Sequence, residues 1–314
     1  KQLAQALRLL PDCMVSEVRV TDLLPSEQDA LRTELPGEKY NPYTPLPVKE
    51  KEMLYGRGEE LRHAVEALQG GHPSLWLIGQ KRVGKTSLLL HLKEHLLPQY
   101  HFAPVFIDFQ LLGNPAQSDI FYEVANAVCN ELRADLRIGD AGAPIRSLFA
   151  NDPATQLIHY LRTVQTQLGG RRLVLLIDEF SRTTDSYFAG QLDGGFFDRW
   201  RAMMHQTLRN QIGYVIVVQR AAMEMLEQRR HEDERKDDPV RKLMDVGTPL
   251  TVRPLGPDAA RRLVEWPMRN YLEHSPQVVD QIIELTGGSP FLIQTFCHKL
   301  VAQMGAQHRR AIEP

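Results

Sequence analysis

Apolar and polar positions along residues 53–254 predict helices and strands in alternation. Four largely apolar runs and a shorter fifth have the length of buried strands, at 74–78, 102–109, 172–179, 213–218 and 249–252. Stretches with helical spacing of apolar residues lie before and between them, at 58–68, 86–97, 120–136, 154–168 and 196–209. Strands that are apolar on both faces and separated by helices predict a parallel sheet covered on both sides.

The pattern changes on either side of this region. Residues 1–35 have helical spacing, and residues 36–52 contain four prolines, which predicts an extended linker. Residues 255–314 are helical in pattern and predict a small lid domain. We therefore expect four parts: a helical N-terminal segment (1–35), a linker (36–52), a core (53–254) and a helical lid (255–314). The charged run from Arg229 to Lys242 predicts a solvated loop.

One motif carries most of the chemical information. Residues 79–86 match G-x-x-x-x-G-K-[ST], the P-loop, between a predicted strand and a predicted helix. Its glycines let successive backbone N–H groups converge on phosphate oxygens. Lys85 adds a positive charge for the β- and γ-phosphates, and the Thr86 hydroxyl is placed to ligate Mg²⁺. The expected nucleotide contacts are Gly79, Gln80, Lys81, Arg82, Val83, Gly84, Lys85, Thr86 and Ser87. A glycine-rich turn without function is the alternative, and the strand–loop–helix context argues against it.

An acidic pair predicts the second half of the site. Asp178 ends a buried apolar run, so it lies at the carboxyl end of a strand, where it can hold Mg²⁺. Glu179 follows and can orient the water that attacks the γ-phosphate, which makes hydrolysis the expected reaction. An exposed acidic pair at a strand end is the alternative reading, and the P-loop upstream disfavours it.

The run 213–218 ends in two polar residues, Gln219 and Arg220. A polar or cationic side chain at this strand tip can report whether a γ-phosphate is present. We expect Arg220 to take this role, because its planar guanidinium is always charged and matches phosphate geometry. Gln219 is the alternative.

Composition narrows the class of protein. The chain has 314 residues, 43% hydrophobic and 24% charged, as in globular proteins of one large or two ordinary domains. A net charge of −2 argues against a whole-protein electrostatic grip on nucleic acid. The three cysteines (Cys13, Cys129 and Cys297) are too scattered for a disulfide framework or a zinc site, and they predict buried thiols in a reducing, cytoplasmic compartment. No apolar run reaches membrane-spanning length, so no membrane partner is expected.

Five signals read jointly resemble the STAND branch of AAA+-type P-loop ATPases and its origin-recognition-type relatives. They are the G-R-x-x-E stretch at 54–60, the P-loop, the strand ending in Asp178-Glu179, the strand ending in Arg220, and Gly288-Ser289-Pro290. The similarity covers roughly residues 53–305. It implies an α/β P-loop NTPase (AAA+/STAND-like) fold, with a parallel sheet flanked by helices and a small C-terminal helical lid. It also implies that Arg57 lies near adenine and ribose and that Pro290 contacts the base.

Members of that family are molecular switches. The resemblance therefore implies ATP/ADP and Mg²⁺ as ligands, ATP hydrolysis with Lys85, Glu179 and Arg220 in catalytic roles, and lid movement with nucleotide state. It further implies self-association into an ATP-dependent oligomer and activation of a fused or partner effector. An arginine finger is not identified, and Arg182, Arg199 and Arg201 are candidates.

Two other functions stay open. A DNA-loading or DNA-remodelling AAA+ ATPase of the initiator or transposition-regulator type is the main alternative. The basic pairs of the chain are scattered and interleaved with acids, which disfavours DNA as the main partner. A scaffold that binds nucleotide with little turnover is the third possibility. The sequence has no N-K-x-D-like motif of the kind GTPases use to read guanine.

Overall fold

The computed structural model describes residues 41–50, 53–70, 74–112, 117–133, 142–208, 211–225, 238–269 and 272–312. The predicted helical segment 1–35 and Cys13 lie outside these residues. The chain divides into two compact units. We call residues 58–81 and 85–252 the sheet unit, and we call the described residues up to Arg57, with 82–84 and those from Arg253 onward, the lid unit.

The sheet unit contains all five predicted strands. They are β1 (Ser74–Gly79), β2 (Phe102–Asp108), β3 (Arg172–Asp178), β4 (Gly213–Gln219) and β5 (Thr248–Val252). Their order in the sheet is β2-β3-β4-β1-β5, and every neighbouring pair is parallel. In this register Gly79 lies opposite Gln219, and Asp108 lies opposite Asp178. The carboxyl ends of β1, β2, β3 and β4 therefore lie along the same end of the sheet.

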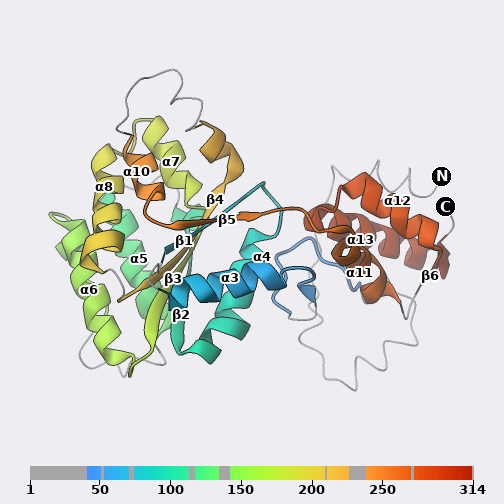
Figure 1. Ribbon diagram of the computed structural model, residues 1–314, viewed down its shortest axis with the longest axis horizontal. Helices are drawn as coiled ribbons and strands as arrows, with labels where there is room; N and C mark the ends of the chain where they lie inside the picture. The colour runs from blue at the N-terminus through green and yellow to red at the C-terminus, as the bar shows by residue number, and fades with distance from the viewer. Residues whose placement is uncertain are drawn as a thin grey trace. The chain divides into compact units, whose positions relative to one another are not determined.

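Helices cover both faces of this sheet, as the apolar strands require. Figure 1 shows α3 (Gly58–Gln69) and α4 (Lys85–His91) on one side, and α5 (Gln117–Glu131), α6 (Pro153–Gln167) and α8 (Gly194–Ala202) on the other. Residues 173–177 of β3 have no exposed surface. The predicted covering of the sheet is confirmed. Cys129, on α5, is a buried free thiol, as predicted.

Among the described residues, α7 (Ser181–Phe188) and α10 (Pro239–Met244) are two of the short helices that were not expected from the sequence. The first directly follows the acidic pair. The second lies where a solvated loop was predicted, so that prediction is wrong for residues 239–242. Asp238 accepts hydrogen bonds from the N–H groups of Val240 and Arg241, and Val240 and Leu243 are buried. The cap and the apolar pair outweigh the charged composition. Residues 229–237 of the predicted loop lie outside the described residues.

The described residues of the lid unit contain three α-helices: α11 (Pro257–Met268), α12 (Pro276–Thr286) and α13 (Pro290–Ala306). Gly287 ends α12 in the left-handed region with φ of 56°, and Ser289 and Pro290 begin α13. Gly288 also has positive φ (70°), and a Cβ there would lie 2.5 Å from the Leu255 carbonyl oxygen. The Leu255 N–H donates to Gly288 O at 2.8 Å. Glycine is therefore required where the chain entering the lid passes this turn.

Part of the predicted linker belongs to the core of the lid unit. Tyr43 is 1% exposed, and its hydroxyl donates to the carbonyl of Val264 on α11. Three further contacts hold residues 41–44 to α13: Asn41 Nδ2 donates to His298 O, the Thr44 N–H donates to Gln294 Oε1, and His298 Nδ1 lies 2.7 Å from Tyr43 O. We call residues 41–48 the strap, because they are packed on the lid helices.

None of the helices in the described parts of the chain combines the length and apolar character needed to cross a membrane.

Candidate functional site

The P-loop and the acidic pair meet through one hydrogen bond. Thr86 is the second residue of α4, and its hydroxyl donates to Asp178 Oδ2 at 2.6 Å. The other carboxylate oxygen, Asp178 Oδ1, accepts the Glu179 N–H at 2.9 Å. Asp178 is 4% exposed. Two oxygen-bearing side chains, 92 residues apart in sequence, thus converge at the carboxyl end of β3.

Burial controls the acidity of Asp178. Desolvation raises its pKa above the ordinary value, and the hydrogen bonds from Thr86 and Glu179 lower it in part. Repulsion from the Glu179 and Asp108 carboxylates adds to the rise. A buried carboxylate among other carboxylates is an environment that a bound cation would stabilise.

Lys85 is held by the loop itself. Its ammonium donates to Gly79 O at 2.9 Å and to Gln80 O at 2.7 Å, and the residue is 6% exposed. Desolvation lowers the pKa of Lys85, and the Glu179 and Asp178 carboxylates oppose that change. A buried cation bonded only to neutral carbonyls gains free energy when an anion approaches.

Glu179 is held in an unusual conformation. Its φ of 52° lies in the left-handed region, which non-glycine residues seldom adopt. The Gln219 side chain donates from Nε2 to Glu179 Oε2 at 2.7 Å, and the Gln219 N–H donates to Ser181 Oγ at 2.8 Å. Strained residues that are fixed by their surroundings cluster at functional sites.

The structure separates the two candidates for a γ-phosphate sensor. Strand β4 lies between β1 and β3, so its tip faces both the P-loop strand and the acidic strand. Gln219 ends β4 and contacts Glu179, whereas Arg220 begins a helix that covers 220–225. The Arg220 side chain is 57% exposed and pairs with Glu224 at 2.9 Å. The structure brings Gln219 to the acidic pair and does not bring Arg220 there.

Arg57 contacts backbone in the lid unit. The side chain is 4% exposed, donating from Nη2 to Val83 O and from Nη1 to Arg253 O, each at 2.8 Å. It therefore joins the tip of the P-loop to the start of the chain that enters the lid. Gly84 lies nearby with φ of 99°, and a Cβ there would lie 3.9 Å from both Arg57 Nη2 and Pro290 Cγ. Arg57 and Pro290 thus lie close to the same P-loop residue.

The remaining P-loop residues differ in exposure. Gln80, Lys81 and Arg82 are exposed, and Val83 and Ser87 are buried. Arg82 has positive φ (65°), and its guanidinium lies 4.2 Å from the centre of the Phe291 ring at the start of α13. This distance is that of a cation–π contact.

Asp108 is a further acidic residue near the site that was not predicted from the sequence. Its strand, β2, is an apolar run that ends in aspartate, which is the same signal that identified Asp178. Asp108 lies opposite Asp178 in the sheet, and its Oδ1 accepts the Gln110 N–H.

Of the arginine-finger candidates, Arg182 and Arg199 are exposed and Arg201 is half-buried, and Arg199 donates to Gln117 Oε1. In the described parts of the chain, no group of three or more His, Cys, Asp and Glu side chains forms a metal site by itself.

No protein-family model and no curated protein matches the sequence. Among solved structures, the chain is similar to the Walker-type ATPase Paby2304 of Pyrococcus abyssi, at 16% identity and a TM-score of 0.57, over 79% of this chain and 68% of that one. It is also similar to the ORC2 protein of Aeropyrum pernix in ADPNP–ADP complexes, at 13% identity and a TM-score of 0.54, over 83% of this chain and 66% of that one. A third is Cdc6p from Pyrobaculum aerophilum, at 17% identity and a TM-score of 0.51, over 84% and 66%.

These similarities establish the fold. The chain spans about two thirds of the length of each of the three proteins. Together with the parallel five-stranded sheet, they confirm the predicted α/β P-loop NTPase fold of the AAA+ type.

Replacing Asp178 with Asn is expected to raise the free energy of unfolding of the nucleotide-free protein at neutral pH. Burial raises the folded-state pKa of Asp178, so its ionisation above the unfolded pKa opposes folding. The gain should vanish as the pH falls below about 4, where the carboxyl group is protonated in both states. Urea unfolding across this pH range measures it. Asp185→Asn, at an exposed site on α7, controls for net charge. A less stable Asp178→Asn variant at neutral pH would contradict the expectation.

Proposed function

We propose that this chain is a Mg²⁺-dependent ATPase of the AAA+ type that works as a nucleotide-controlled switch. The observation that carries the proposal is the contact of Thr86 with Asp178 at 2.6 Å, beside Lys85 and the Glu179–Gln219 pair. Phosphoryl transfer needs positioned charges and an oriented water more than covalent chemistry, and these side chains supply both.

The residues present fit a metal-bound triphosphate. The Thr86 hydroxyl and the Asp178 carboxylate are oxygen donors of the kind Mg²⁺ prefers, and the raised pKa of Asp178 reflects a negative charge that burial penalises. When bound, the ion would neutralise charge on the phosphates. Lys85 would turn from the Gly79 and Gln80 carbonyls toward the β- and γ-phosphates.

Glu179 is the proposed general base for the attacking water. One of its carboxylate oxygens accepts a hydrogen bond from the Gln219 amide at 2.7 Å. That hydrogen bond orients the carboxylate and competes with a water for the same oxygen. We assign the γ-phosphate-reading role to Gln219 in place of Arg220, because an amide that leaves Glu179 for a phosphate oxygen would release the base at that moment.

The switch part of the proposal rests on the lid unit. Arg57 bonds the P-loop tip at Val83, Arg82 stacks on Phe291, and Gly84 lies close to Pro290. Any rearrangement of the P-loop tip by phosphate would therefore reach the first turn of α13. We propose that ATP and ADP favour different lid positions, and that the ATP form self-associates and activates an effector protein or a fused domain, as in STAND-type ATPases. A shift from mostly one form to mostly the other needs about 5 kcal/mol of differential binding.

An initiator-type ATPase is the second candidate. Similarity to the ORC2 protein and to Cdc6p favours it as much as the switch. Under this function the ATP form would load onto or remodel DNA. DNA binding in a mobility-shift assay, with a log affinity that falls steeply as log salt rises, would favour the initiator. An ATP-dependent oligomer that forms equally well with and without DNA would favour the switch.

Glu179→Gln is expected to keep ATP binding and to slow hydrolysis by about 100-fold or more, because loss of a general base has effects of that size. Lys85→Ala should remove ATP binding itself, since the cation for the phosphates is gone. Calorimetry and phosphate release measure the two effects separately. Full turnover in Glu179→Gln, or unchanged ATP affinity in Lys85→Ala, would refute the proposed site.

Gln219→Ala and the neighbouring Arg220→Ala form a matched pair. Gln219→Ala should slow hydrolysis by about tenfold or more, because Glu179 loses a hydrogen bond to a charged group. It should also weaken ATP binding more than ADP binding. Arg220→Ala should change neither quantity by more than about twofold, because its exposed pair with Glu224 contributes little. A larger loss of hydrolysis and of ATP preference in Arg220→Ala than in Gln219→Ala would instead assign the sensor role to Arg220.

Phe291→Leu tests the coupling of P-loop and lid without altering the P-loop. Loss of the Arg82 cation–π contact, of the order of 1 kcal/mol, should change the ATP-induced protection of α13 by about fivefold. Hydrogen exchange of residues 291–294 with and without ATP measures it. The adjacent Leu292→Ala, at a 38% exposed side chain, is the control and should respond like the wild type. If ATP changes the protection of α13 equally in Phe291→Leu and Leu292→Ala, the contact of Arg82 with Phe291 does not couple the P-loop to the lid.

A further inference from the structure

The solvent-facing side of α11, in the lid unit, carries an exposed tryptophan between two arginines. Trp266 is 55% exposed, and Arg262 and Arg269 are also exposed. The arginines lie four residues before and three residues after the tryptophan, so all three side chains share one face of the helix. We call these three residues the α11 stripe. At a rise of 1.5 Å per residue, the two arginines lie about 10 Å apart along the helix axis.

The Trp266 ring is held by its neighbour and is not part of the lid core. The Arg269 guanidinium lies 3.4 Å from the centre of the ring, which is a cation–π contact. This contact fixes the orientation of the ring, yet more than half of the side chain stays open to solvent. Other apolar side chains of the helix are buried in the lid unit, namely Ala260, Leu263, Val264 and Met268. An exposed side chain of this size is a candidate contact for a partner.

The arginine next to the stripe takes up two nearby acids. Arg261 pairs with Glu265 on its own helix and with Asp280 on α12. Arg262 and Arg269 have no carboxylate partner within the described residues. The stripe therefore presents two guanidinium groups whose charge is available to an external anion.

A further cation lies beyond the C-terminal end of α11. Strand β6 (Glu273–His274) pairs with β7 (Ala311–Ile312), and the Glu273 N–H donates to Arg310 O at 2.7 Å. This pairing brings the exposed Arg310, which is far along the chain, to within a few residues of the end of the helix. The exposed acids Asp258 and Glu273 lie beyond the two ends of the stripe. The cationic stretch is therefore short and suits a few units of a polyanion.

We propose that the α11 stripe binds single-stranded nucleic acid. A base would stack on Trp266, and the phosphates on either side of that base would contact Arg262 and Arg269. Stacking on an aromatic ring combined with arginine contacts to the backbone is the chemistry of single-strand binding without sequence preference. The proposal names a surface and a strand state for the initiator-type candidate, and it does not depend on ATP hydrolysis.

Other classes of partner fit the stripe less well. Trp266 is the one large apolar side chain that α11 exposes, and a helix that binds a lipid surface presents a whole apolar face. An acidic peptide would use the arginines and leave the exposed ring without a role. A nucleic-acid strand uses both, because every nucleotide carries a planar base and a phosphate.

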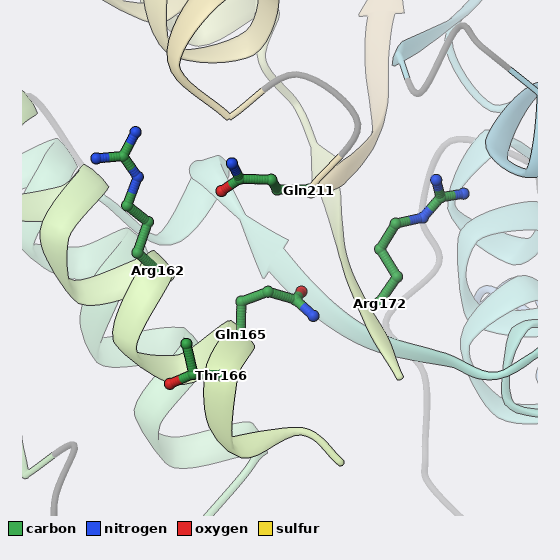
Figure 2. Close-up of a pocket in the computed structure, with 5 residues that line it drawn as sticks. All are labelled: Arg162, Gln165, Thr166, Arg172 and Gln211. Atoms are coloured by element: carbon green, nitrogen blue, oxygen red, sulfur yellow. The ribbon is translucent and has the colours of Figure 1, made fainter. Parts of the chain in front are cut away.

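The chain offers a matched control in Arg162, which is an exposed helical arginine without a carboxylate partner among the described residues. It lines a cavity of about 480 Å³ at the amino ends of β3 and β4, together with Arg172. Figure 2 shows the two guanidinium groups turned away from each other, and no aromatic side chain lines the cavity. Arg162 thus carries the same charge as the stripe arginines without a ring beside it.

Intrinsic fluorescence of the full chain tests the stacking directly. Of the three tryptophans, Trp76 and Trp200 are 2% and 0% exposed, so Trp266 is the one that a base can reach. Titration with a short oligothymidylate in the absence of ATP is expected to quench the emission. Trp266→Phe should lose the quenching and keep most of the affinity, measured by anisotropy of a labelled oligonucleotide. Trp266→Ala should weaken binding by about tenfold, because stacking of one base has that strength.

Salt dependence tests the two arginines. Arg262→Gln/Arg269→Gln should reduce the slope of log affinity against log salt by about 1.4, since each phosphate contact to a single strand contributes about 0.7. The control Arg62→Gln/Arg162→Gln removes two exposed charges elsewhere and should leave affinity and slope unchanged. Thermal unfolding of each variant reports whether it is folded.

Several outcomes would overturn the proposal. They are absence of oligonucleotide binding, binding that does not quench the emission, and equal affinity in the wild type and Trp266→Ala. Binding of anionic lipid vesicles or of polyglutamate in place of the oligonucleotide would assign the stripe to another class of partner. ATP hydrolysis by Trp266→Ala should match the wild type. A wild-type chain that binds the oligonucleotide but does not hydrolyse ATP would refute the proposed ATPase and leave this surface in place.

Discussion

The hydrogen bond between the Thr86 hydroxyl and the Asp178 carboxylate is the constraint on which the proposed nucleotide site depends. It joins the first turn of α4, the helix that follows β1, to the carboxyl end of β3, and β1 and β3 are not neighbours in the sheet. Each carboxylate oxygen of Asp178 has one donor, yet burial still raises its pKa. The folded protein therefore keeps buried negative charge at the proposed Mg²⁺ site, although this charge lowers its stability. Functional sites commonly reduce stability in this way.

Features encoded by local pattern could be predicted from the sequence. The five strands are apolar throughout because both faces of the sheet are covered, and each was found within a few residues of its observed bounds. The P-loop was found because its spacing is nearly unique, and Asp178 because an acid directly follows a buried run. Asp108 gives the same signal and could have been predicted in the same way.

Features that depend on strand order or on distant packing could not be predicted. The choice between Gln219 and Arg220 is a matter of one residue, because β4 ends at Gln219 and the chain turns into a helix at the next position. Only the order β2-β3-β4-β1-β5 places that tip between the P-loop strand and Asp178. The charged composition of this stretch did not predict α10, because its two buried residues are separated by Arg241 and Lys242. A cavity at the amino ends of the strands combines residues from α6, β3 and the turn before β4, which no sequence spacing connects.

The strap limits where this chain can be truncated without destabilising the lid unit. Proline-rich composition invites a truncation near residue 50, directly ahead of the P-loop region. Such a cut would remove Tyr43 from between α11 and α13 and would leave the carbonyl of Val264 without its donor. The helical bundle would then retain a hole the size of an aromatic ring, with a typical penalty of about 3–5 kcal/mol. Expression boundaries for a shortened protein therefore belong upstream of Asn41.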